Sequence, residues 1–115
     1  MTEITAYKVL TADQMAALER DGSFAGAEVD LADGYIHLST AAQLTETVDK
    51  HFAGRTDLHI AAVDLEALGD QVRWEPSRGG QIFPHLYGPL PLDAVVAYSR
   101  LERDDDGAVR LPVTG

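Results

Sequence analysis

The chain has 115 residues, the usual size of one domain, so we expect a single domain over residues 1–115 with its own core. It contains no cysteine, which excludes disulfides, zinc–thiolate sites and cysteine nucleophiles. Nine basic and nineteen acidic residues give a formal net charge of −10, which disfavours nucleic acid and anionic membranes as partners. Because neither a signal peptide nor a run of about 18 apolar residues is visible, we expect a soluble, cytoplasmic protein; its oligomeric state is open.

The N-terminal third predicts a strand, a helix and an irregular segment. Residues 4–10 have the pattern of a strand. Thr11 and Gln14 have the spacing of a capping box, which predicts a helix from about Ala12, and Gly22 is a typical helix end. Residues 23–33 are expected to cross the molecule as irregular chain.

A second strand and a second helix follow. Gly34 opens the strand, which is expected over residues 35–39. Thr40 and Gln43 repeat the capping-box spacing, and Gly54 is the expected end of that helix. The buried side of the helix is predicted to carry Leu44, Val48 and Phe52.

Strands dominate the second half of the sequence. We expect strands at residues 58–64, 72–75 and 95–101, a helical turn at 65–68, a loop at 77–81, and an edge strand at 108–113 after an Asp106-Gly107 hairpin. Pro76 should end the second of these strands. Three prolines exclude a regular helix over residues 83–92, which should be extended. Two early helices followed by many strands predict an α+β fold rather than a doubly wound one.

The strand at residues 35–39 offers the first candidate site. Strand geometry places Tyr35, His37 and Ser39 on one face. The helix that begins after Thr40 would present free N–H groups suited to an anion. These residues could therefore form a ligand-pocket wall; the alternative is a buried, hydrogen-bonded and inert His37.

The proline-rich segment at residues 83–92 is the second candidate. Prolines stiffen an extended backbone, and His85 and Tyr87 alternate along it so that both could face one ligand. The alternative is a stiff connection whose aromatic side chains fill the core.

Charged residues on and after the strand at 72–75 are the third candidate. Glu75 shares a strand face with Arg73, and Arg78 follows in a glycine-containing loop. A carboxylate could stabilise a cation or orient a hydroxyl, while the arginines could meet phosphates. The alternative is an ordinary surface ion pair.

Local motifs for metal binding or nucleophilic catalysis are missing. The four histidines have no ligand spacing, so a metal site would need folding to bring His37, His85 and Glu75 together, and we assign no metal ligand. Ser39 lacks the flanking glycines of a nucleophile elbow. His51 and His59 are interpreted as structural.

Several of these segments resemble the family catalogued as domain of unknown function 952, whose members are uncharacterised bacterial proteins. The motifs that carry the resemblance span nearly the whole chain: Tyr7-Lys8-Val9-Leu10, Asp33-Gly34-Tyr35-Ile36-His37-Leu38-Ser39-Thr40, Arg73-Trp74-Glu75 and Phe83-Pro84-His85-Leu86-Tyr87-Gly88-Pro89-Leu90.

In fold, that family resembles the ADP-ribosyltransferase-like group. The resemblance implies mixed or antiparallel sheets in a split barrel with a cleft for NAD, the one cofactor it suggests. By analogy of role, Glu75 would be the carboxylate that stabilises an oxocarbenium-like ribose, and Tyr35 or Tyr87 would stack on nicotinamide. His37 and His85 would bind ribose hydroxyls or phosphates. The first strand carries Lys8 where those transferases place Arg or His.

Two functions are therefore open. In the first, a cleft lined by His37, Glu75 and His85 binds a nucleotide-like or other small anionic ligand of the NAD or ADP-ribose type, with or without transferase or hydrolase activity. Tyr35, Ser39, Thr40, Arg73, Arg78 and Tyr87 would contribute to binding. In the second, the protein is a non-catalytic interaction module in which these motifs only hold the fold.

Overall fold

The computed structural model describes residues 4–112, except for the side chain of Arg78. Its strands form three small antiparallel sheets. The first sheet has the order β1-β4-β8, with bounds Thr5–Thr11, Leu58–Asp64 and Val95–Arg100. The second has the order β3-β6-β5, with bounds Ile36–His37, Ile82–Leu86 and Val72–Pro76. The third pairs β2 with β7, Ser23–Phe24 with Leu90–Pro91.

Within residues 4–112, four α-helices and three short 3₁₀ turns connect these strands. The α-helices are α1 (Ala12–Asp21), α2 (Glu28–Asp33), α3 (Ala41–His51) and α4 (Leu65–Leu68). The 3₁₀ turns are η1 (Gly69–Gln71), η2 (Arg78–Gly80) and η3 (Leu92–Ala94). The predicted α+β class is confirmed, with the two longest described helices in the first half of the chain. Across residues 4–112 the sheets remain separate and do not close into a barrel.

The two main helices begin where capping predicted. The Thr11 side chain accepts a hydrogen bond from the Gln14 N–H, and the Gln14 side chain accepts one from the Thr11 N–H. The same reciprocal pair caps α3 at Thr40. Gly22 ends α1 with φ 75°, a left-handed conformation that glycine adopts at little cost. The predicted end of α3 at Gly54 was late, since the helix ends at His51.

The prediction of irregular chain over residues 23–33 was wrong. The segment contains β2 and the helix α2. The N-cap of α2 is Ala27, which has no side-chain acceptor, so the sequence carried no visible start signal. Instead, Asp30 reaches back and accepts the Ala27 N–H at 2.8 Å.

Three other strand boundaries differ from expectation. The strand expected at residues 35–39 is only Ile36–His37, although Ser39 forms an isolated bridge with Tyr7. The strand expected at residues 72–75 extends one residue further and ends at Pro76, the residue predicted to end it. The expected edge strand at 108–113 is reduced to a bridge between Arg103 and Val109, and residue 113 lies outside the described range. The extended segment expected at 83–92 contains β7 and all of β6 but its first residue, and only Leu92 differs, because it begins η3.

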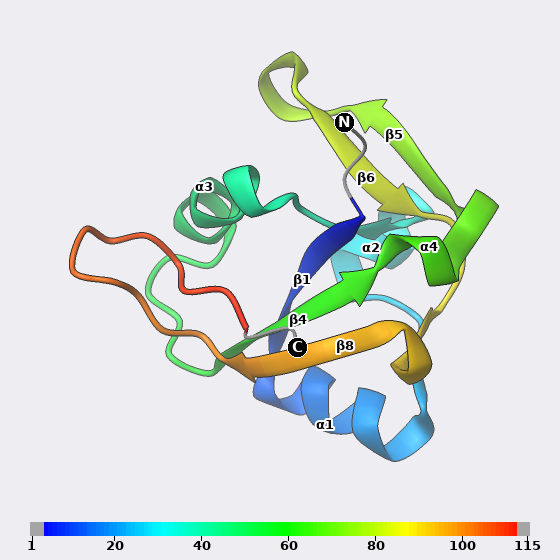
Figure 1. Cartoon of the computed structure of the whole chain (residues 1–115), viewed down its shortest axis with the longest axis horizontal. Helices are drawn as coiled ribbons and strands as arrows, with labels where there is room; N and C mark the ends of the chain where they lie inside the picture. Colours follow the sequence, from blue (N-terminus) through cyan, green and yellow to red (C-terminus); the bar gives the residue numbers. More distant parts are fainter. Residues whose placement is uncertain (1–3, 113–115) are drawn as a thin grey trace.

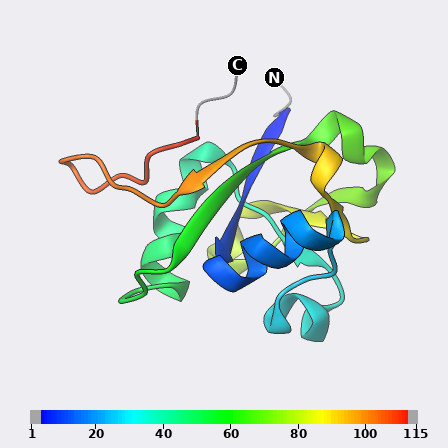
Figure 2. The ribbon, with the colours of Figure 1, turned by 90° about the horizontal axis from the view of Figure 1, so that it is seen from below.

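The core consists of two clusters that share β1. Ala6 and Leu10 pack with α1 and with the β3–β6 strands, whereas Tyr7 and Val9 pack with α3. Strand alternation explains this division, because successive side chains point to opposite faces. Figures 1 and 2 show α1 and α3 at different sides of the β1–β4–β8 sheet, with the β5–β6 hairpin beyond β1. Within residues 4–112, no helix is long and apolar enough to cross a membrane.

Candidate functional site

A buried carboxylate joins three elements at the centre of the site. Asp30, in α2, is 1% exposed. Its Oδ2 accepts a hydrogen bond from the Ala27 backbone N–H at 2.8 Å, and its Oδ1 accepts one from the His37 backbone N–H at 3.1 Å and lies 2.6 Å from His37 Nδ1. Gly26 precedes this turn, and a Cβ at that position would lie 2.9 Å from the Cβ of Asp30. The close approach therefore explains the glycine.

Lys8 supplies the positive charge for that carboxylate. Its Nζ donates to Asp30 Oδ2 at 2.9 Å and to the His37 carbonyl oxygen at 3.1 Å, although the residue is only 5% exposed. Burial lowers the pKa of Lys8, and the Asp30 carboxylate offsets part of this effect. Burial alone would raise the pKa of Asp30, but the His37 hydrogen bond, the Lys8 charge and the two backbone N–H groups hold it well below its usual range.

His37 lies between two carboxylates. Its Nδ1 faces Asp30 at 2.6 Å, and its Nε2 faces Asp33 Oδ2 at 2.9 Å. Carboxylates only accept hydrogen bonds, so both contacts are hydrogen bonds at once only when both ring nitrogens carry protons. Both ring nitrogens of His37 and the ammonium of Lys8 therefore face carboxylates of α2.

His85 belongs to a second polar cluster beside the first. It is the direct register partner of His37 across β3 and β6, and the two ring centroids lie 5.6 Å apart. Its Nδ1 lies 2.8 Å from Glu75 Oε1, and the Tyr87 hydroxyl donates to the same oxygen at 2.8 Å. The Tyr35 ring stacks on His85 at 4.0 Å. Hydrogen bonds from His85 and Tyr87 lower the pKa of Glu75, so this carboxylate is charged at neutral pH.

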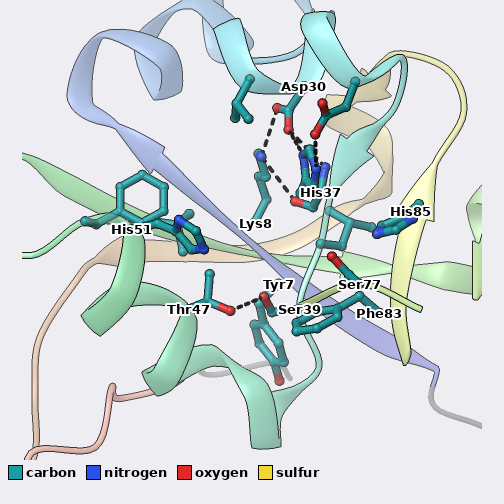
Figure 3. Close-up of a pocket in the computed structure, with 15 residues that line it drawn as sticks. Tyr7, Lys8, Asp30, His37, Ser39, Thr47, His51, Ser77, Phe83 and His85 are labelled. Atoms are coloured by element: carbon teal, nitrogen blue, oxygen red, sulfur yellow. Dashed lines mark hydrogen bonds and ion pairs between the residues drawn. The ribbon is translucent and has the colours of Figure 1, made fainter. Parts of the chain in front are cut away.

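A cavity of about 450 Å³ lies between the β1–β4–β8 and β3–β6–β5 sheets, with α2 and α3 at its ends. Its polar lining includes Lys8, Asp30, Asp33, His37 and His85. Its apolar lining includes Val9, Val29, Leu38, Phe52 and Phe83. In Figure 3, Asp30 and His37 lie above the cavity, Thr47 and Ser39 below it, and His51 and His85 at its two sides. The volume lies in the range of small-molecule sites.

The cavity brings together some of the predicted site residues. His37, His85 and Ser39 line it. Glu75 does not; it contacts His85 instead. The expected cleft is therefore lined by both histidines, with the carboxylate one contact further out.

The remaining predicted ligand-binding residues are placed around the cavity. Tyr35 lines a neighbouring hollow, and Tyr87 carries Arg73 over its ring at 5.3 Å. Thr40 caps α3 with its side chain and is not part of the cavity lining. The Arg78 side chain lies outside the described part of the structure. Within residues 4–112, no three His, Asp or Glu side chains lie close enough together to hold a metal ion. This includes the set of His37, His85 and Glu75.

Sequence reasoning missed Lys8 and Asp30 as site residues. A signal was present for Lys8, because it interrupts a strand whose neighbours from Ala6 to Leu10 are all apolar. A lysine at such a position needs a buried acidic partner. The sequence offers no comparable signal for Asp30, because it lies in a short helix without a recognisable cap.

A family model described as "Protein of unknown function (DUF952)" matches residues 9–98. The chain belongs to this family. No curated protein matches the chain. The matched residues include the whole of α2 and the β5–β6 hairpin, so the DUF952 region contains Asp30, His37 and the His85 cluster, while Lys8 lies one residue before it.

Solved structures of a similar protein share the fold. The crystal structure of protein CC0527 from Caulobacter crescentus is 44% identical, covers 92% of this chain and 93% of that chain, and has a TM-score of 0.83. The crystal structure of a double mutant of CC0527 gives 42% identity, the same coverage and a TM-score of 0.83. The solution NMR structure of CC0527 gives 45% identity, 91% and 90% coverage, and a TM-score of 0.78.

Proposed function

We propose that this DUF952 protein binds a nucleotide-like ligand of the NAD or ADP-ribose type in the cavity between its two larger sheets. The observation that carries the proposal is the position of His37 and His85, which line one cavity of about 450 Å³ from paired strands. Ligand sites of this kind combine mostly apolar walls with a few polar groups that fix orientation.

The apolar lining suits a planar base. Phe52 and Phe83 line the cavity together with Val29, which is 58% exposed on α2. Aromatic side chains stack on the faces of heterocyclic rings without requiring a particular hydrogen-bond pattern. A nicotinamide or adenine ring would therefore find apolar contacts here while its sugar faces the polar groups.

The polar lining suits hydroxyl groups better than bare phosphate. Asp33 is 45% exposed at its side chain and offers carboxylate oxygens, which accept hydrogen bonds from ribose hydroxyls. Lys8 and His37 already face carboxylates, which leaves little unmatched positive charge to attract a ligand phosphate. We infer that the ribose lies against His85 and Asp33, and that Lys8 and His37 make secondary contacts with the ligand.

A relationship to the ADP-ribosyltransferase-like folds forms part of this proposal. Those proteins hold NAD in a cleft between two sheets, and here the cavity is lined by β1 of one sheet and by β3 and β6 of another. Their carboxylate contacts the ligand directly. The proposed counterpart Glu75 instead contacts His85, so its influence on the ligand would pass through that ring.

Titration with NAD and with ADP-ribose tests the proposal. We expect both to shift the NMR signals of His85 and Ser39, which line the cavity, and His85→Asn to weaken binding. His59→Asn is the matched control, because His59 lies in β4 and does not line the cavity. Absence of any shift at millimolar concentrations of both ligands would refute the proposal.

A non-catalytic module is the second candidate, and the Lys8–Asp30–His37 network favours it. That network connects β1, α2 and β3 through hydrogen bonds that are buried or partly buried, as expected of residues that stabilise a fold. On this view, neither nucleotide shifts the cavity residues, and His85→Asn alters only the free energy of unfolding.

A further inference from the structure

His85 combines burial with an unused ring nitrogen. The residue is 2% exposed, and its Nδ1 is occupied by Glu75 at 2.8 Å. Its Nε2 is buried and has no hydrogen-bond partner within the described part of the chain. Buried polar atoms are nearly always partnered, and His85 lines the cavity, which a ligand or a water molecule could enter.

The Glu75 contact decides which nitrogen carries the proton. A carboxylate accepts hydrogen bonds and does not donate them, so in the neutral ring Nδ1 carries the hydrogen and Nε2 keeps its lone pair. Stacking of Tyr35 at 4.0 Å fixes the plane of the ring. Tyr87 donates to the same Glu75 oxygen and fixes the carboxylate. The ring is thus oriented as a proton acceptor by Glu75 at Nδ1 and by Tyr35 on its face.

We propose that His85 is the general base of this cavity and that Glu75 is its positioning residue, in the transfer of the ADP-ribosyl group of an NAD-type nucleotide to water. This inference rests on the proposed function and assigns the chemistry to it. Histidine bases held by a carboxylate on the other nitrogen are a recurrent catalytic arrangement.

The step balances without any further reactant. The water oxygen forms a bond to C1′ of the ribose as the C1′–N bond to nicotinamide breaks. The electron pair of that bond leaves with nicotinamide, which departs as a neutral molecule. The water proton passes to Nε2 of His85 and later to solvent, so the products are nicotinamide, ADP-ribose and one proton.

The surrounding charges suit this reaction. Positive charge develops on the ribose as the glycosidic bond breaks, and carboxylates placed nearby stabilise it. Asp33 is partly exposed and lines the cavity, as does Asp30. The imidazolium that forms on His85 would be stabilised by the Glu75 carboxylate at 2.8 Å. Glu75 therefore acts through His85 and need not contact the substrate.

The test measures nicotinamide release from NAD, together with NAD binding, for the wild type and matched variants. His85→Asn keeps an amide N–H near the position of Nδ1 and removes Nε2. Glu75→Gln keeps an oxygen that can accept from Nδ1 and removes the charge. His59→Asn is the control for a histidine outside the cavity. Urea unfolding and NMR spectra establish that each variant is folded, and Glu75→Gln decides the question if His85→Asn does not fold.

We expect His85→Asn to lower kcat by about 10²–10⁴-fold, the usual contribution of a general base. Glu75→Gln should lower kcat by at least about tenfold with little change in KM, because the lost charge matters only when the ring is protonated. His59→Asn should match the wild type. Wild-type kcat in folded His85→Asn or Glu75→Gln would overturn the inference. NAD binding without nicotinamide release would overturn it while leaving the proposed function intact, whereas absence of NAD binding would overturn both.

Discussion

His37 and His85 face each other across β3 and β6, yet their surroundings differ in one decisive respect. Both nitrogens of His37 contact carboxylates, Asp30 at 2.6 Å and Asp33 at 2.9 Å. Only Nδ1 of His85 contacts a carboxylate, and Nε2 has no protein partner among the described residues. The two histidines are equivalent in strand position but have different amounts of hydrogen-bonding capacity left for a ligand.

This difference distinguishes a histidine that stabilises the site from a histidine that could act on a ligand. A ring with both nitrogens bound joins α2 to β3 and has little left to offer a ligand. A ring with one free nitrogen, oriented by a carboxylate, can accept a proton. Sequence reasoning placed His37 at the centre of the site, whereas our proposal places His85 there.

Removal of Asp30 should have the largest effect on the holding cluster. Asp30→Ala leaves Lys8 buried without its counter-charge, and we expect the free energy of unfolding to fall by about 3–5 kcal/mol. Urea denaturation measures this loss. The double variant Lys8→Met with Asp30→Ala should recover part of the stability, because no unpaired charge remains. A loss of under about 1 kcal/mol, typical of an exposed pair, would contradict the account.

Acid should weaken the same cluster. The folded-state pKa of Asp30 lies below its unfolded value, so its contribution to stability is complete above the unfolded pKa and is lost as pH falls. The free energy of unfolding should therefore decline from about pH 5 downwards. Urea denaturation across this range should show a shallower decline in Asp30→Asn. Equal slopes in the two proteins would show that Asp30 does not titrate with folding.

Loss of the His37 ring should cost less than loss of Asp30. His37→Ala removes one charge-assisted hydrogen bond to Asp30, and the backbone N–H and Lys8 still satisfy that carboxylate. We expect a decrease of roughly 1.5–3 kcal/mol in the free energy of unfolding. Urea denaturation of His37→Ala and Asp30→Ala under the same conditions compares the two losses of unfolding free energy. A larger loss in His37→Ala would contradict the prediction.

Asp33 should matter least for stability. Its side chain is 45% exposed, and exposed ion pairs contribute little. We expect Asp33→Asn to change the free energy of unfolding by under about 1 kcal/mol. An effect as large as that of His37→Ala would show that the outer carboxylate also holds the fold.

The sequence allowed prediction of features that depend on local signals. Reciprocal capping at Thr11 and Thr40 located the starts of α1 and α3, and the prolines identified the extended segment that carries His85. Helix α2 was missed because its cap is an Ala27 backbone group held by a side chain three residues later. That bond is visible only in the folded chain.

Pairings between distant residues could not be predicted in the same way. The ion pair of Lys8 and Asp30 joins residues 22 positions apart, and no sequence motif shows that these two residues are partners. The motifs did indicate that His37, His85 and Glu75 belong to one region, and the ring and hydrogen-bond contacts place them together. Which of them would keep a free nitrogen depends on Asp30 and Asp33, and therefore on α2.

The position of the proton on the His85 ring tests the central claim most directly. Nitrogen-15 NMR of the imidazole side chains distinguishes protonated from bare ring nitrogens in the wild-type protein. The account predicts a proton on Nδ1 and a bare Nε2 for the neutral His85 ring. A neutral His85 ring with its proton on Nε2 and a bare Nδ1 would contradict it.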